Sequence, residues 1–288
     1  MLDYHLHLWE HGTKARQATV EQLAAYCERA AEQGVTEIAL TEHLFRFDQA
    51  DAVLGGWWRD EPNERRRDEM ARYWYDHVSA DLDAYVETAL AAKAAGLPVV
   101  MGMEVDYYPG RMDQVSSLLS GYPFDVLLGS VHWLGTWMFD DLDSAFAMGE
   151  WDSRTVESVW DEYTRALEEL AATGAVDVLA HPDLCKVTGR RPAVPDEWYD
   201  RMAEAAAGAG IAAEVNASGY RKPLAEPFSP PPLLERFRRA GVPVTTASDA
   251  HRLEHVAMRS ADLRSMVVAA GYTTLRAFTA RTPREVSI

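Results

Sequence analysis

The chain has 288 residues, of which 48% are hydrophobic, so it is long and apolar enough to bury a substantial core. Its 45 acidic residues outnumber the 28 basic ones, and the resulting net charge of -17 repels polyanions and argues against nucleic-acid binding. No apolar run approaches the roughly 20 residues that cross a bilayer, and the start resembles no secretory signal, so we expect a cytoplasmic protein without a membrane partner.

Seven short apolar runs of β type recur along the chain, and a segment with helical character follows each of them. The predicted strands are Leu2–His7, Ile38–His43, Val99–Glu104, Val126–His132, Val176–His181, Ile211–Asn216 and Val244–Asp249. The predicted helices lie near residues 19–33, 78–95, 113–120, 154–173, 196–209, 231–240 and 254–270. This alternation implies a parallel sheet, and since no glycine-rich phosphate loop follows the first strand, we predict one α/β barrel domain over residues 1–288.

Residues 45–78 look like an insertion after the second strand, and residues 186–196 and 219–232 are rich in proline and arginine. Loops that follow barrel strands lie on the catalytic face, so these segments are placed to form a lid. An extra surface helix with ordinary loops is the alternative. The tryptophans of this region either cover an amino-bearing or heteroaromatic substrate or pack in the core: Trp57, Trp58, Trp74, Trp133 and Trp137.

The histidines carry the strongest signal for a functional site. Glu104 closes the third predicted strand and Asp249 the seventh. Parallel strands in a barrel all end at the same face, so residues at their ends converge there, and imidazole and carboxylate groups together bind Zn, Mn or Fe. Because no Cys-x-x-Cys spacing is present, we expect a catalytic rather than a structural metal site. The histidines at or just beyond strand ends are His5, His7, His43, His132, His181 and His251.

Three further histidines lie away from the strand ends. His11 follows the first strand closely enough to join the metal ligands, and although Glu10 competes with it, we favour His11 because the other outer ligands are imidazoles. His77 and His255 lie in helical stretches, where we expect solvated or capping roles.

Short motifs in the order of the chain resemble the polymerase-and-histidinol-phosphatase (PHP) superfamily over essentially the whole length. These motifs are His5-Leu6-His7, Thr41-Glu42-His43, Gly102-Met103-Glu104-Val105-Asp106, Gly129-Ser130-Val131-His132, Ala180-His181-Pro182-Asp183 and Ser248-Asp249-Ala250-His251. Three more look most like the monofunctional histidinol-phosphate phosphatases: Tyr122-Pro123-Phe124-Asp125, Ser130-Val131-His132-Trp133-Leu134-Gly135 and Glu214-Val215-Asn216-Ala217-Ser218-Gly219.

The resemblance implies a distorted (β/α)7 TIM-like barrel with three divalent ions (Mn, Zn or Fe) at the C-terminal face of the strands. Carried over by position, the first ion is held by His5, His7, Glu104 and Asp249. Glu104 bridges to the second ion, which His132 and His181 also hold, and the third is held by His11, His43 and His251.

The implied activity is that of a metal-dependent phosphomonoesterase of histidine biosynthesis, which hydrolyses L-histidinol phosphate to L-histidinol and phosphate. The implied nucleophile is a metal-bound hydroxide that attacks phosphorus. The implied catalytic residues are Asp249, His251 and Glu104, which act as ligands of the metal ions. The leaving alkoxide takes a proton or charge stabilisation from Asp183, a metal-bound water or the third ion.

A small phosphorylated metabolite must be drawn into a strongly negative chain, so local cations are required. Arg221 and Lys222 follow the sixth strand, and Arg190 and Arg191 follow the fifth. Because guanidinium groups suit bidentate phosphate contacts, we predict that Arg221 and Arg190 bind substrate, with Lys186 as a third candidate.

Other functions remain as alternatives. A PHP phosphoesterase for another small phosphorylated metabolite or nucleotide would keep the same ligands. A metal-dependent C–N hydrolase often has a lysine at the end of the fourth strand, where this chain has His132. A non-catalytic metal-binding domain usually loses ligands, and all the expected ones are present here.

Overall fold

In a computed structural model that describes all residues 1–288, seven parallel strands form one sheet in the order of the chain. Between the first and last strands, Leu6 and Ala250 form a parallel bridge and the Asp249 amide donates to the His5 carbonyl at 2.9 Å, so the barrel is nearly closed. The predicted (β/α)7 architecture is confirmed. The strands are β1 (Leu2–Leu6), β2 (Glu37–Leu40), β3 (Val99–Asp106), β4 (Val126–Ser130), β5 (Val178–Leu179), β6 (Ala212–Asn216) and β7 (Val244–Ala247).

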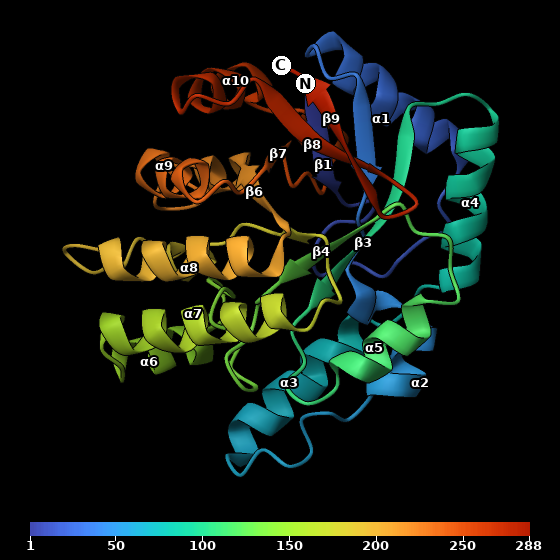
Figure 1. Ribbon diagram of the computed structural model, residues 1–288. Coiled ribbons are helices and arrows are strands. Elements are labelled where there is room, and N and C mark those ends of the chain that lie inside the picture. The colour runs from blue at the N-terminus through green and yellow to red at the C-terminus, as the bar shows by residue number, and fades with distance from the viewer.

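Helices connect successive strands on the outside of the barrel (Figure 1). The seven predicted helices are confirmed, with ends shifted by a few residues, while α6 (Ala145–Asp152) was not predicted. The seven are α1 (Val20–Glu32), α4 (Leu82–Ala94), α5 (Met112–Leu119), α7 (Val156–Ala172), α8 (Asp196–Ala209), α9 (Pro231–Arg239) and α10 (Ser260–Ala269).

Helix α7 illustrates how the sequence sets these elements. Its first turn is capped by Thr155, whose side chain accepts from the Ser158 amide, which satisfies one of the free N–H groups at the helix start. Residues spaced three and four apart, including Trp160, Tyr163 and Leu167, are buried on one face against the rest of the core.

The segment predicted as an insertion forms a 3-10 turn and two helices after β2. The turn is η1 (Leu44–Arg46), and the helices are α2 (Asp48–Leu54) and α3 (Glu64–His77). Trp74 of α3 is completely buried, and its indole N–H donates to Asp51 of α2 at 2.7 Å. Further single 3-10 turns follow β5, β6 and β7: η2 (Leu184–Lys186), η3 (Ala217–Arg221) and η4 (Leu253–His255).

A C-terminal antiparallel hairpin, β8 (Thr274–Thr279) and β9 (Thr282–Ser287), closes the opposite end of the barrel. Phe278 packs in one cluster with the interior residues Leu2 and Tyr4. Arg281 pairs with Asp177, which lies just before β5 begins. The hairpin was not predicted, although its alternating residues carry a strand signal. Because it occupies the N-terminal end of the barrel, only the C-terminal ends of the strands remain open for a site.

The helices of the fold are all too short or too polar to serve as bilayer-spanning segments.

Candidate metal centre

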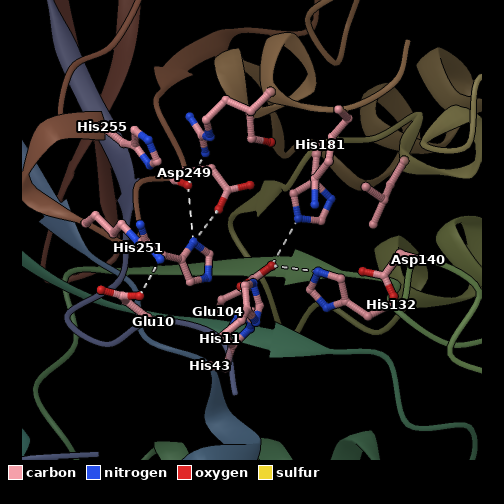
Figure 2. A pocket seen from close by; sticks show the side chains of 15 residues that line it. Glu10, His11, His43, Glu104, His132, Asp140, His181, Asp249, His251 and His255 are labelled. Carbon is pink, nitrogen blue, oxygen red and sulfur yellow. Dashed lines mark hydrogen bonds and ion pairs between the residues drawn. The ribbon is translucent and has the colours of Figure 1, made fainter. Parts of the chain in front are cut away.

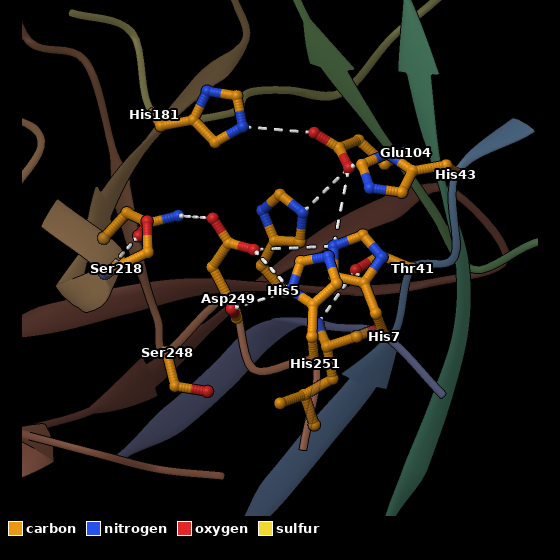
Figure 3. A network of polar contacts seen from close by, with 12 residues as sticks. His5, His7, Thr41, His43, Glu104, His181, Ser218, Ser248, Asp249 and His251 are labelled. Carbon is orange, nitrogen blue, oxygen red and sulfur yellow. Dashed lines mark hydrogen bonds and ion pairs between the residues drawn. The ribbon is translucent and has the colours of Figure 1, made fainter. Parts of the chain in front are cut away.

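Eight of the nine predicted metal ligands, all except His11, come together at the C-terminal ends of the strands. Figure 3 shows seven of these eight, and His132 is labelled in Figure 2. Each parallel strand ends at this face, so residues far apart in the sequence become neighbours. Those inside strands are His5 in β1 and Glu104 in β3. Those that follow a strand directly or within a few residues are His7, His43, His132, His181, Asp249 and His251.

Glu104 lies at the centre of this group. Its Oε2 atom is 2.7 Å from His43 Nδ1 and 3.2 Å from His5 Nε2. On the other side, its Oε1 atom is 3.1 Å from His181 Nε2 and 3.4 Å from His132 Nε2. Because this buried carboxylate offers one oxygen to each side, it can bridge two cations.

Several sets of three side chains place one ligand atom each within 4.8 Å of one another. The sets are His5, His7 and Glu104; Glu104, His132 and His181; His7, His43 and His251; His5, His181 and Asp249; and His43, Asp106 and His132. The first set falls within the ligands expected for the first ion, and the second set matches those expected for the second ion. The third set contains His43 and His251, which are expected to hold the third ion together with the loop residue His11.

Three acids outside the predicted ligand set orient the imidazoles. The Nδ1 atom of His5 lies 3.0 Å from Glu214, that of His7 lies 3.3 Å from Glu42, and that of His132 lies 2.6 Å from Asp106. A carboxylate next to Nδ1 favours a proton on that nitrogen. The Nε2 atom of the ring then keeps its lone pair, with which it can bind a metal ion. These acids were quoted in the sequence motifs without a role, and their signal is a buried carboxylate at or near the end of an apolar strand.

The fit of these residues to metal ions is visible in their unsatisfied atoms. The Nε2 atoms of His5, His7, His43 and His251 and the Oε2 atom of Glu104 are buried, and none forms a hydrogen bond of acceptable geometry, although several lie within 3.5 Å of one another. Leaving such atoms unpaired is costly, whereas a divalent cation satisfies them together. Nitrogen and carboxylate donors without thiolate are the set that Zn, Mn and Fe accept, so the residues fit divalent metals.

Two of the candidate ligands have unusual backbone conformations. Asp249 has φ of 52° and His181 has φ of 27°, in the region that side chains other than glycine rarely adopt. Strain of this kind persists where the surrounding structure enforces it, and it is concentrated at functional sites.

The two carboxylates carry the charge that a cation requires. Burial favours the neutral form of Glu104, but the surrounding imidazoles, His43 and His5 foremost, hold its pKa well below the usual range. Burial acts in the same way on Asp249, and His5 and His7 hold its pKa well below the usual range as well. Both side chains are therefore ionised at neutral pH.

A cavity of about 350 Å³ opens above these ligands (Figure 2). All of its lining residues except Leu184 are polar or charged, which suits a charged substrate rather than an apolar one. Besides the ligands it is lined by Glu10, Asp140, Leu184, Ser218, Arg221, Lys222, Arg252 and His255.

A model of the PHP domain matches residues 3–218, well over half of the chain. The chain belongs to the PHP domain family. It is similar to a probable histidinol-phosphatase of Deinococcus radiodurans, with 29% identity over 238 residues that cover 82% of this chain and 83% of the relative.

Two solved structures share this PHP fold. A histidinol phosphate phosphatase from Lactococcus lactis subsp. lactis Il1403, complexed with Zn, L-histidinol and phosphate, has a TM-score of 0.71 and 20% identity, and the match covers 98% of each chain. A putative histidinol phosphatase from Listeria monocytogenes has a TM-score of 0.67 and 19% identity over 91% of this chain and 99% of the other.

In the loop after β1, the His11 ring lies against two of the candidate metal ligands, and Glu10 lines the same cavity. The His11 ring stacks on His251 with a centroid distance of 3.9 Å and lies 5.5 Å from the His43 ring. Glu10 instead pairs with Arg252 at 2.7 Å. The loop is held by the buried Arg46, which donates to two of its carbonyl groups.

Of the predicted substrate-binding residues, only Arg221 lines the cavity. Its guanidinium donates to the carbonyl oxygens of Ser248 at 3.0 Å and Asp249 at 2.6 Å, so it also holds the loop that carries a candidate ligand. The neighbouring Lys222 lines the same cavity and forms no ion pair, which makes its ammonium group the freer cation.

The structure does not bring Lys186, Arg190 or Asp183 to the cavity. Lys186 and Asp183 are buried in a pair at 2.7 Å, and Asp183 also accepts from the Ser229 amide, so these two residues tie neighbouring loops together. Arg190 points outward and pairs with Asp152 at 2.7 Å. Sequence position after β5 was misleading because Leu184 is the last residue after β5 that reaches the cavity, and Lys186 and Arg190 pair with acids elsewhere.

Most of the tryptophans named in the sequence pack in the core. Trp58, Trp74, Trp133 and Trp137 are buried there, and Trp57 is partly buried against it. Trp133 also lines a second cavity beside the first. His77, for which a solvated or capping role was expected, is buried and lines this second cavity too. His255 lies at the wall of the first cavity.

Proposed function

We propose that this PHP domain is a phosphomonoesterase that hydrolyses L-histidinol phosphate to L-histidinol and phosphate with three divalent ions. The observation that carries the proposal is the buried Glu104, which faces imidazoles on both sides beneath a polar cavity that also holds Arg221 and Lys222. The similar proteins, one related in sequence and two related in fold, are described as histidinol-phosphatases, which supports this choice of substrate.

Each of the three ions has a proposed set of ligands. Glu104 would be shared between the first and second ions. The sets are His5, His7, Glu104 and Asp249; Glu104, His132 and His181; and His11, His43 and His251.

Divalent cations supply Lewis-acid catalysis, since they neutralise the charge of a phosphate ester and activate water for attack. The protein holds the ligands in place beforehand through Glu214, Glu42 and Asp106, each of which fixes one imidazole ring. Preorganised ligands do not reorient during the reaction, which lowers its barrier.

The positively charged side chains at the cavity wall bind the phosphate group of the substrate. Lys222 offers an unpaired ammonium group, while Arg221 keeps the Asp249 backbone in position and adds positive charge. These two charges offset the repulsion that a dianion meets in a chain of net charge -17. Asp183 is excluded from the cavity, so we assign it no part in protonating the leaving group.

The experiment is phosphate release from L-histidinol phosphate by protein reconstituted with Mn, beside a panel of sugar, amino-alcohol and nucleotide phosphates. We expect histidinol phosphate to be the preferred substrate with kcat/KM of roughly 10⁴ M⁻¹s⁻¹ or more. Glu104→Gln and Asp249→Asn should abolish turnover while the circular dichroism spectrum is unchanged. Preference for another ester would refute the substrate, and near-normal turnover by either variant would refute the metal assignment.

A further inference from the structure

A second cavity, of about 480 Å³, continues from the first on the side of His132. Both cavities are lined by His11, His132, Asp140, Arg221 and Lys222, so the two form one continuous space. The second cavity contains residues for which the phosphate chemistry has no use: Tyr73, His77, Trp133, Met138, Asp141, Leu142 and Asp143.

One wall of this cavity is aromatic. The rings of Tyr73 and His77 are tilted by 32° with their centroids 4.1 Å apart, and both rings lie against Phe45. Trp133 packs against Phe45 from another side, with its indole N–H donated to the Tyr107 carbonyl. Phe45 also stacks on His43 with a centroid distance of 4.8 Å. Phe45 therefore lies between the aromatic wall and a candidate metal ligand.

His77 presents an unpaired acceptor at this wall. Its side chain is only 6% exposed, and its Nδ1 lies 2.7 Å from the Tyr73 carbonyl, which can only accept. Nδ1 therefore carries the proton, and Nε2 of the neutral ring has a free lone pair and no partner within the protein. Burial lowers the pKa of His77, which keeps the ring neutral.

The point where the two cavities join is acidic. Asp140 lies there beside His132 (Figure 2), and its carboxylate forms no hydrogen bond or ion pair within the protein. Asp141 and Asp143 line the second cavity and have no side-chain partners either. A cationic group bound at this junction would pair with Asp140 while lying close to the metal-binding residues.

We infer that the second cavity binds the leaving alcohol of the substrate as an amino-alcohol with a heteroaromatic ring, the ammonium group on Asp140 and the ring between Tyr73, His77 and Trp133. The inference rests on the proposed function, because it assigns the leaving group of that reaction. In histidinol phosphate the ammonium sits on the carbon next to the ester carbon, and the imidazole extends beyond it. This order matches Asp140 at the junction and the aromatic wall farther in.

The residues act on different parts of the substrate, so selective losses test the inference. Three esters are compared: L-histidinol phosphate, imidazolylpropyl phosphate, which lacks the amine, and alaninol phosphate, which lacks the ring. Asp140→Asn should lower kcat/KM about 10- to 100-fold for the two amine-bearing esters and change it less than about twofold for imidazolylpropyl phosphate. His77→Phe should lower it about tenfold for the two imidazole-bearing esters only.

Asp113→Asn, on the exposed face of α5, is the matched control and should leave all three values unchanged. Metal content and melting temperature are measured for every variant. If Asp140→Asn loses metal, the inference is judged on the selectivity of His77→Phe alone, because His77 touches no candidate metal ligand. Equal losses on all three esters, or no loss on any, would overturn the inference. Failure of the unmodified protein to hydrolyse histidinol phosphate while it cleaves another ester would instead refute the proposed function.

Discussion

Glu214 offers a direct test of the idea that buried acids hold the metal-binding imidazoles in place. Its carboxylate is fully buried and accepts three hydrogen bonds. One oxygen faces His5 Nδ1 at 3.0 Å, and the other accepts from the His181 amide and from the Asn216 side chain, each at 2.8 Å. All the atoms around this carboxylate thus act as donors.

Glu214→Gln keeps the size of the side chain but replaces one acceptor oxygen with an NH₂ donor. With the amide oxygen facing His181 and Asn216, the NH₂ group faces His5 and donates to Nδ1, so the proton of the neutral ring moves to Nε2. That proton blocks the atom that points at Glu104. The substitution therefore acts on metal binding and leaves the hydrogen bonds of the metal-free protein largely satisfied.

We expect the variant to bind metal about 10- to 100-fold more weakly, a loss of about 1.4 to 2.7 kcal/mol. The affinity is measured by competition with a coloured Zn chelator, and turnover at saturating metal should recover most of the activity. Glu235→Gln, at an exposed position of α9, serves as the control. Metal affinity equal to that of the unmodified protein would refute the role of Glu214 in orienting His5.

Three further outcomes are expected. Lys222→Ala should raise KM for phosphate esters about tenfold with little change in kcat, and Lys222→Arg should restore KM; an unchanged KM would remove Lys222 from the phosphate site. Phe278→Ala leaves a hole beneath the barrel and should lower the free energy of unfolding by about 3–5 kcal/mol in urea titrations, with kcat/KM unchanged because the hairpin is at the other end of the barrel. Burial raises the pKa of Cys27 to about 11 and that of Cys185 well above the usual range, so a thiol reagent should label neither in the native protein and both in denaturant; labelling of the native protein would contradict this.

The sequence allowed the barrel and the meeting of its ligands to be predicted because both depend on regular features. Apolar runs of β type alternate with amphipathic segments, and that alternation admits few topologies. Once the strands are parallel, a histidine at the end of each must lie near the others. His5 and His181 are 5.6 Å apart as ring centroids although they are distant in the sequence.

The prediction was weakest where the local pattern is ambiguous. Helix α6 lies in a stretch without a clear amphipathic period, and the β8–β9 hairpin follows the last helix, where no further element was expected. Arg190 and Lys186 follow a strand like Arg221 does, yet each pairs with an acid outside the cavity. Only the path of the chain after the strand decides whether such a side chain faces the site.

The sequence by itself determined the fold class, the face of the barrel that carries the chemistry and the residue types gathered there, since strand periodicity and chain direction are local properties. The tertiary structure alone decided which acids support which imidazoles, which cations face the cavity and which aromatic residues line the cavity wall. Pairs such as His5 with Glu214 and Lys186 with Asp183 depend on side-chain directions and on packing between segments distant in the chain, and no local pattern encodes these.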